Sequence, residues 1–229
     1  MGTKAIISYD GTETDRDALA LGLMLAPVVG SLSLAYVRHA EQSDPGHEEL
    51  EQEEAEQLLE KGVALLGCDA KSHVITDAST ANGLLALVQQ EHANVIVFGS
   101  EYHTAPGHVK PGISAQKMLV GGPTAVAIAP AGLYNNPGKL IAKVGYTAEI
   151  GDESSRETAQ SLAESAGAEL VAVTDRTSAD PSIDFLVVGS KPFTSPGKTV
   201  IGAADKYLLE LSTCPVLVLP REVAVDFTA

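Results

Sequence analysis

The sequence contains no tryptophan, only two cysteines and few aromatic residues of any kind, with 4 Phe and 6 Tyr. Cys68 and Cys214 stand far apart and form no C-x-x-C pair, so neither a disulfide framework nor a thiolate metal site is indicated. No stretch approaches the roughly 18 apolar residues of a membrane-spanning helix, and the strand-like start at residues 4–9 does not resemble a signal peptide. We therefore expect a cytoplasmic protein with reduced thiols and no membrane partner.

Positive charge is also scarce. The chain has 15 Lys and Arg against 30 Asp and Glu, which gives a formal net charge of -15 at pH 7. An acidic excess of this size argues against electrostatic binding to nucleic acid or to an anionic membrane. Many of the acids stand between Glu41 and Glu60, where no Lys or Arg occurs. That pattern is typical of a solvated helix face, and a docking site for a basic partner is the alternative.

Motifs for catalysis and metal binding are missing as well. The sequence has no G-x-S-x-G elbow, no Cys–His pairing, no paired-carboxylate motif and no H-E-x-x-H spacing. Residues 196–199 read P-G-K-T, but Pro192 stands where a phosphate loop of the G-x-x-x-x-G-K-T type needs glycine. We expect no catalytic residue and no metal site. His103 and His108 are interpreted as an exposed pair in one loop, and contact between His103 and a nucleotide phosphate is the alternative.

A repeat organises the chain. Residues 95–100 read V-I-V-F-G-S and residues 185–190 read F-L-V-V-G-S, and each run precedes a Pro-Gly loop and an amphipathic segment. At a constant offset of 90 residues, ten positions of the first copy carry the same residue in the second: Val97, Gly99, Ser100, Thr104, Pro106, Gly107, Gly112, Leu119, Val126 and Pro130. The repeat predicts two related domains, 1–130 and 139–229, joined by a linker at 131–138.

Alternating apolar runs and amphipathic segments predict an α/β fold with parallel sheets that are covered by helices on both faces. Right-handed crossovers then give the first domain the strand order 3-2-1-4-5. In the second domain, too few residues separate Val173 from Phe185 for two helices and a strand. We therefore predict two doubly wound parallel sheets, the second truncated to the order 2-1-4-5. The alternation of Val223, Val225 and Phe227 predicts a final strand that covers a sheet edge.

The carboxyl ends of strands 1 and 4 flank the crevice in which such sheets bind ligands. Here those ends carry Asp10-Gly11-Thr12 and Gly99-Ser100. A carboxylate at one lip accepts hydrogen bonds from a ribose or a base, and a glycine loop that opens a helix offers backbone N–H groups to phosphate. The two segments therefore predict a nucleotide site. Thr12 or Thr14 is expected to cap the helix that follows strand 1.

The Asp-Gly-Thr end of strand 1, the Gly-Ser pair after strand 4 and the Pro-flanked last strand of each copy resemble the universal stress protein family in its tandem form. The resemblance implies an adenine nucleotide alpha hydrolase-like fold and ATP or AMP as ligand, with magnesium only beside ATP. It assigns ligand contacts to Asp10, Gly99 and Gly112, and places Val37 where a backbone group faces adenine. Two positions of the first domain depart from the family's loop: Tyr102 replaces a glycine, and Ile113 replaces a hydroxyl residue that Ser114, one position on, could supply.

The second domain departs further from the family's pattern. It keeps the two glycines that bound the loop, Gly189 and Gly202. Three ligand positions are replaced: Gly145 stands for the Asp, Pro192 for the middle glycine and Ala203 for the hydroxyl residue. Each hydrogen bond lost to a charged ligand weakens binding by about 1.5–3 kcal/mol, or roughly ten- to a hundredfold. We therefore expect a degenerate second site.

Three functions are compatible with these observations. The first is a non-catalytic stress-response regulator that binds ATP or AMP weakly in the first domain and acts on a protein partner that the sequence does not identify. Its domains would pack as an internal pseudo-dimer through their fifth strands, with homo-oligomers left open. A slow ATPase and a ligand-free structural adaptor are the alternatives.

Overall fold

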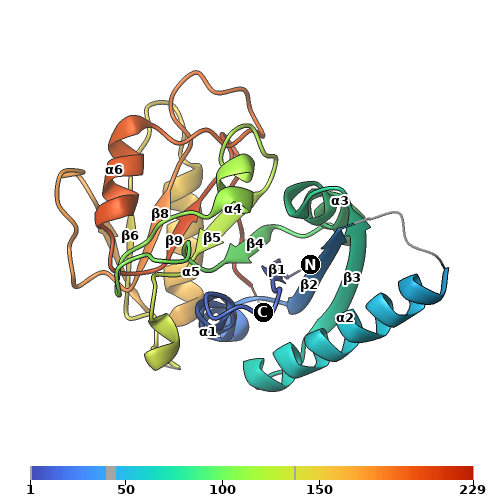
Figure 1. Ribbon diagram of the computed structural model, residues 1–229. Helices are drawn as coiled ribbons and strands as arrows, with labels where there is room; N and C mark the ends of the chain where they lie inside the picture. The colour runs from blue at the N-terminus through green and yellow to red at the C-terminus, as the bar shows by residue number, and fades with distance from the viewer. Residues whose placement is uncertain (1, 40–44, 137, 229) are drawn as a thin grey trace.

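The computed structural model describes residues 2–39, 45–136 and 138–228, which form one nine-stranded sheet with helices on both faces (Figure 1). The strands are β1 (Lys4–Ser8), β2 (Ser31–His39), β3 (Lys71–Asp77), β4 (Val95–Phe98), β5 (Ala125–Ile128), β6 (Lys143–Tyr146), β7 (Glu169–Ala172), β8 (Phe185–Val188) and β9 (Val216–Val218). The helices are α1 (Asp15–Leu25), α2 (Pro45–Leu66), α3 (Thr80–Glu91), α4 (Ile113–Met118), α5 (Ser154–Ala166) and α6 (Ala203–Leu211), with short 3-10 helices η1 (Ala26–Val28) and η2 (Leu133–Asn135).

The strand order is β3-β2-β1-β4-β5-β9-β8-β6-β7. Its first five strands have the predicted order 3-2-1-4-5, and the last four, taken inward from β7, have the predicted order 2-1-4-5. All neighbours within each half are parallel. Every residue of β4 and β8 is buried, as expected of apolar strands that are covered on both faces.

The structure differs from the sequence expectation in the number of sheets, because hydrogen bonds join the two halves at their fifth strands. β5 and β9 pair antiparallel, with Ala127 opposite Leu217 at the centre. The flanking pairs are Val126 with Val218 and Ile128 with Val216. Since these residues are equivalent at the offset of 90, each half contributes the same positions to the junction. The pairing therefore has the self-complementary form of a two-fold interface, and it removes one exposed edge from each half.

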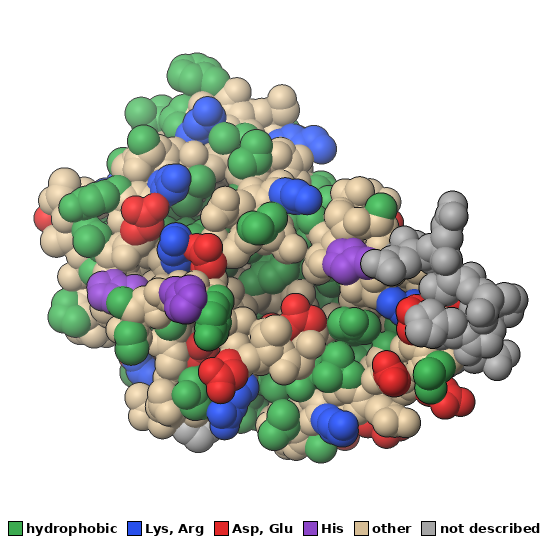
Figure 2. Space-filling model, viewed as in Figure 1, with side chains coloured by type: hydrophobic (Ala, Val, Ile, Leu, Met, Phe, Trp, Pro, Cys, Tyr) green, Lys and Arg blue, Asp and Glu red, His purple; other side chains and the backbone are tan. Residues whose placement is uncertain are grey.

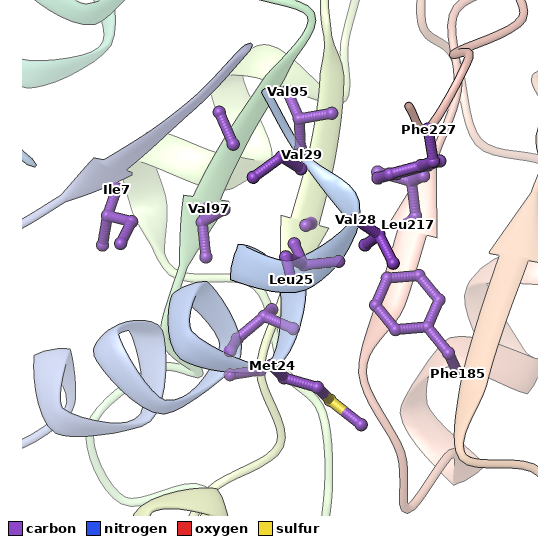
Figure 3. Packing of buried hydrophobic residues seen from close by; sticks show 14 of the residues in the cluster. Ile7, Met24, Leu25, Val28, Val29, Val95, Val97, Phe185, Leu217 and Phe227 are labelled. Carbon is purple, nitrogen blue, oxygen red and sulfur yellow. The ribbon is translucent and has the colours of Figure 1, made fainter. Parts of the chain in front are cut away.

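Two apolar layers cover the sheet. One contains buried residues of α1, α2 and α5, and the other contains buried residues of α3, α4 and α6. The first layer crosses the junction: Figure 3 shows Leu25 and Val28 between the strands of the first half and the group of Phe185, Leu217 and Phe227. The halves therefore share a hydrophobic core. The domain boundaries at 130 and 139 stay a prediction.

The C-terminal tail is not the predicted edge strand. Val225 donates its backbone N–H to Thr158 Oγ1 at 2.8 Å, and Phe227 donates its own to Ser161 Oγ at 2.9 Å, so hydroxyl groups of α5 replace a strand partner. Both apolar side chains are buried, whereas Val223 is 37% exposed. Thr3 Oγ1 donates a hydrogen bond to the Asp226 carbonyl, which brings the two ends of the chain together. The alternation thus reflects contact with a helix and the core.

The acidic stretch is described from residue 45 onward, so Glu41 and Asp44 lie outside the described residues. Within α2, the side chains of Glu53, Glu56 and Glu60 are exposed. The prediction of a solvated helix face is confirmed for this part. Across the described ranges, none of the helices combines the length and apolar character needed to cross a membrane.

We predict that Phe227→Ala lowers the free energy of unfolding by about 3–5 kcal/mol, because the substitution leaves a cavity in the core that both halves share. Chemical denaturation measures the change. Val223→Ala, at the exposed end of the same tail, should change stability by less than about 0.5 kcal/mol. Equal effects of the two substitutions would contradict the packing described for the tail.

Candidate functional site

The loop that follows β4 is fastened by Ser100. Its Oγ donates a hydrogen bond to the Ala129 carbonyl at 2.7 Å and accepts one from the Lys110 N–H at 3.1 Å. Ser190 makes the equivalent bonds, to the Leu219 carbonyl at 2.7 Å and from the Val200 N–H at 3.0 Å. The repeat therefore extends to individual hydrogen bonds. The buried hydroxyl of Ser100, predicted to contact a ligand, holds the loop to the sheet.

β1 and β4 are neighbours, as predicted, with Ile7 opposite Val97, so their carboxyl ends lie side by side. The two lips are in direct contact. A Cβ atom at Gly99 would lie 2.2 Å from the Thr14 carbonyl oxygen, so only glycine fits there. Gly99 thus serves the close approach of the β1–α1 loop, a requirement that exists with or without a ligand.

Asp10, Gly11 and Thr12 are exposed at the other lip. Gly11 has a φ of +80°, a conformation that favours glycine, and Asp10 Oδ1 accepts a hydrogen bond from the Thr12 N–H at 3.3 Å. Leu58 of α2 packs over the loop, since a Cβ at Gly11 would lie 2.6 Å from its Cδ1 atom. The predicted trio therefore forms one tight turn with its polar side chains toward solvent.

Asp15 organises this turn, and the sequence analysis did not identify it. Its Oδ2 atom accepts hydrogen bonds from the Asp10 N–H at 2.8 Å and the Thr12 N–H at 3.0 Å. Burial, followed by interaction with the Asp10 carboxyl, raises the pKa of Asp15 to about 7. The expected capping by Thr12 or Thr14 is wrong: Thr14 is the N-cap residue, but its side chain makes no capping bond, and the two hydroxyls pair with each other at 3.0 Å. The position of Asp15 in the first turn of α1 is the sequence feature that could have identified it.

The other predicted site residues are spread along the same edge. Val37 is buried on β2 and faces α3, where a Cβ at Gly83 would lie 2.8 Å from its Cγ1 atom. Gly112 is the N-cap of α4, with a φ of -72° and open space where a Cβ would be, so its conformation does not require glycine. Ser114 follows in the first turn and is half-buried. An isolated antiparallel β-bridge between Ser100 and Pro111 holds the two ends of the loop after β4 together.

The loop between Gly99 and Gly112 is closed by its own contacts. Lys110 Nζ pairs with Glu101 Oε2 at 2.7 Å, and the Glu101 N–H donates to the Lys110 carbonyl at 2.7 Å. Tyr102 is 67% exposed, with its ring centroid 4.1 Å from that of His103. His103 and His108 are both exposed, as predicted. Tyr102 therefore points to solvent, and Glu101 and Lys110 close the loop on each other.

The crevice of the second half is filled by charged side chains. Arg176 Nη1 contacts Glu149 Oε1 at 2.7 Å and Asp205 Oδ2 at 2.9 Å, and Arg176 Nη2 donates to the Ala148 carbonyl at 2.6 Å. Glu149 and Asp205 are nearly inaccessible, with side-chain exposures of 5% and 2%. Burial raises the pKa of Asp205 to about 6, opposed by the Arg176 charge and assisted by the neighbouring Glu149. We call these three residues the Arg176 cluster.

The Arg176 cluster was not predicted from the sequence. Arg176 lies in the short connection that replaces the missing middle of the second half, and no motif marks it. Glu149 follows β6 as the Asp10 loop follows β1, and a Cβ at Gly189 would lie 3.1 Å from Glu149 Cγ. The prediction that Gly145 replaces the Asp is wrong: Ile7 pairs with Val97 as Tyr146 pairs with Val187, so Glu149 is the counterpart of Asp10. Gly145 lies inside β6 and is fixed by packing, because a Cβ there would lie 2.6 Å from Ile183 Cδ1. Intramolecular ion pairs thus occupy the place that corresponds to the first crevice.

A hollow of about 510 Å³ lies between β2 and α2, beside the first crevice. Tyr36, Arg38 and His39 line its β2 side, and Glu51 and Leu58 line its α2 side. Leu58 also covers Gly11, so the hollow and the Asp10 turn are adjacent. In the part of the chain that the structure describes, no group of three or more His, Cys, Asp and Glu side chains is arranged to hold a metal ion.

No family model and no curated protein matches the chain. Solved structures do. A universal stress protein from Archaeoglobus fulgidus has a TM-score of 0.58 and 15% identity, over 95% of this chain and 98% of that one. A putative universal stress protein from Pseudomonas aeruginosa has a TM-score of 0.55 and 16% identity, over 96% and 93%. A functionally unknown protein from the same organism has a TM-score of 0.55 and 15% identity, over 96% and 93%. The resemblance is thus confirmed for the fold, across nearly the whole chain.

We predict that Arg176→Met lowers the free energy of unfolding by about 3–5 kcal/mol, because it leaves two buried carboxyl groups without their cation. Arg156→Met is the matched control: Arg156 pairs with Glu153 at 3.5 Å on the surface, and its loss should cost less than about 1 kcal/mol. Denaturant titration of both variants measures the difference. Similar losses would show that the Arg176 cluster has no special role in stability.

The raised pKa of Asp15 makes the stability of the fold depend on pH. Its folded pKa is raised above the unfolded value, so its contribution to stability is fully present below about pH 4 and is lost as the pH rises to about 7. Asp15→Asn keeps an acceptor oxygen without the charge, and should raise the free energy of unfolding at pH 8 by up to about 4 kcal/mol while leaving it nearly unchanged at pH 4. Denaturation at both pH values, with Asp69→Asn as an exposed control, measures this. A gain that is equal at the two pH values would refute the assignment.

Proposed function

We propose that the protein is a non-catalytic regulator of the stress-response type, which binds an adenine nucleotide weakly at the first crevice and leaves the second without ligand. The observation that carries the proposal is the asymmetry between two equivalent crevices. The first presents exposed Asp10 and Thr12 side chains beside a hollow of about 510 Å³. The second holds the Arg176 cluster. A regulator of this kind would act in the cytoplasm through a protein partner.

The chemistry of the first crevice supports a nucleoside monophosphate better than a triphosphate. The Asp10 carboxylate offers acceptors for ribose hydroxyls, and the adjacent hollow has aromatic and apolar surface from Tyr36 and Leu58 for a base. On the phosphate side, the Ser100 hydroxyl is engaged with the Ala129 carbonyl and the Lys110 ammonium with Glu101, so neither group is available to additional phosphates. AMP would therefore bind more tightly than ATP, and magnesium would be involved only if ATP bound.

A ligand-free adaptor is the second candidate, and the closed loop favours it. The contacts between Glu101 and Lys110 and the bonds of Ser100 hold the loop between Gly99 and Gly112 without a ligand. Mass spectrometry of protein purified from cells separates the two functions. A regulator with an occupied first crevice would release adenine nucleotide on denaturation, and an adaptor would release none.

Isothermal titration calorimetry with AMP and ATP tests the proposal. Wild-type protein should bind AMP with one site per chain, and Asp10→Ala should weaken binding by roughly ten- to a hundredfold through the loss of hydrogen bonds to a charged group. Asp69→Ala removes the same charge from an exposed position that precedes β3, at the opposite edge of the sheet, and should leave affinity unchanged. Absence of heat at millimolar AMP, or equal affinity of Asp10→Ala and wild type, would contradict nucleotide binding.

A further inference from the structure

A groove of about 290 Å³ lies between α4 and α6, where the two halves meet on one face of the sheet. Leu119 and Leu209 are buried at its floor. Val120, which follows α4 and is 76% exposed, and half-buried Ile201 continue the apolar surface to the rim. Ile113, the first residue of α4, is 74% exposed but does not line the groove. The groove therefore forms a contiguous apolar surface with exposed aliphatic side chains, which is typical of an interaction site.

Lysine side chains surround the groove. Lys110 and Lys206 line it, and Lys117 lies in the last turn of α4, one residue beyond the lining residue Gln116. The acids nearby are Glu101, which pairs with Lys110, and Glu210. Figure 2 shows Lys and Arg side chains interleaved with hydrophobic ones and a few acidic ones over α4 and α6, and further acidic side chains along α2. In a chain with twice as many acids as bases, this local excess of lysine is unusual.

The internal repeat shows that the fold does not require these side chains. At the offset of 90, Ile113 corresponds to Ala203, and Val120 corresponds to Glu210. Both helices begin after an equivalent N-cap glycine and occupy equivalent places in the sheet topology. One helix keeps polar or small residues at positions where the other exposes Ile and Val. The exposed Val120 of the groove thus has no apolar counterpart in the second half.

We propose that the groove is a docking site for an acidic amphipathic helix of a protein partner. Apolar side chains of such a helix would fill the space between α4 and α6, and flanking carboxylates would pair with Lys117 and Lys206. A second copy of the chain that docks through the same groove is disfavoured, because two-fold contact would place lysine against lysine. The site is separate from the Asp10 crevice and does not depend on nucleotide binding.

The test uses a labelled synthetic peptide with the sequence of residues 48–66 as a model acidic amphipathic helix, titrated with the full-length protein in fluorescence anisotropy without nucleotide. A scrambled peptide of the same composition keeps the charge but loses the apolar stripe. The wild-type protein should bind the first peptide at least tenfold more tightly than the scrambled one. Failure to bind, or equal binding of the two peptides, would overturn the proposal.

Substitutions locate the site. Val120→Asp combined with Lys206→Glu should weaken peptide binding at least tenfold, because it removes an apolar contact and reverses a charge in the groove. The matched control is Leu140→Asp combined with Lys61→Glu, which makes the same changes at exposed positions elsewhere and should bind as wild type does. Circular dichroism melts check that both variants fold. Unchanged binding by the groove variant would overturn the proposal. It would also be overturned if sedimentation showed that the wild-type protein is a dimer and that the groove variant is a monomer, because the groove would then bind a second copy of the chain.

Discussion

The antiparallel pairing of β5 with β9 is the contact on which the rest of the structure depends. Each half ends in a short, wholly buried apolar strand, and a strand of that kind cannot be left at an open edge. Symmetric pairing about Ala127 and Leu217 covers the exposed edge strand of both halves at once. It also fixes α4 beside α6 and brings η1 against α5, so the shared core and the lysine-rimmed groove both follow from this one junction.

The two crevices share the same framework but differ in their contents. The bonds of Ser100 and Ser190 are equivalent, and so are the left-handed residues His103 and Phe193. The two crevices differ in the segment that connects the second strand of each half to the fourth. In the first, a full β2–α2–β3–α3 segment covers Gly11 through Leu58; in the second, a short connection delivers Arg176 to two buried carboxyl groups. The short connection thus supplies the second crevice with an internal cation.

Sequence reasoning predicted the fold well because strand order depends on patterns that are local and repeated. The runs before Gly99 and Gly189, with their constant offset, gave both strand orders. It predicted the site less well because side-chain partners depend on contacts between distant residues. The bonds from Asp15 to the Asp10 turn and the reach of Arg176 to Asp205 have no motif. The alternation of Val223, Val225 and Phe227 misled for the same reason: hydroxyls of α5 supplied the partners that a strand would have needed.

The central claim is that the halves fold as one unit through the β5–β9 junction and the core beneath it. Native-state hydrogen exchange tests this most directly. Amides of β6 and β8 should exchange only through global unfolding, with the same free energy as amides of β1 and β4. Exchange of the second half through a separate opening of lower free energy, while β1 and β4 stay protected, would contradict the claim.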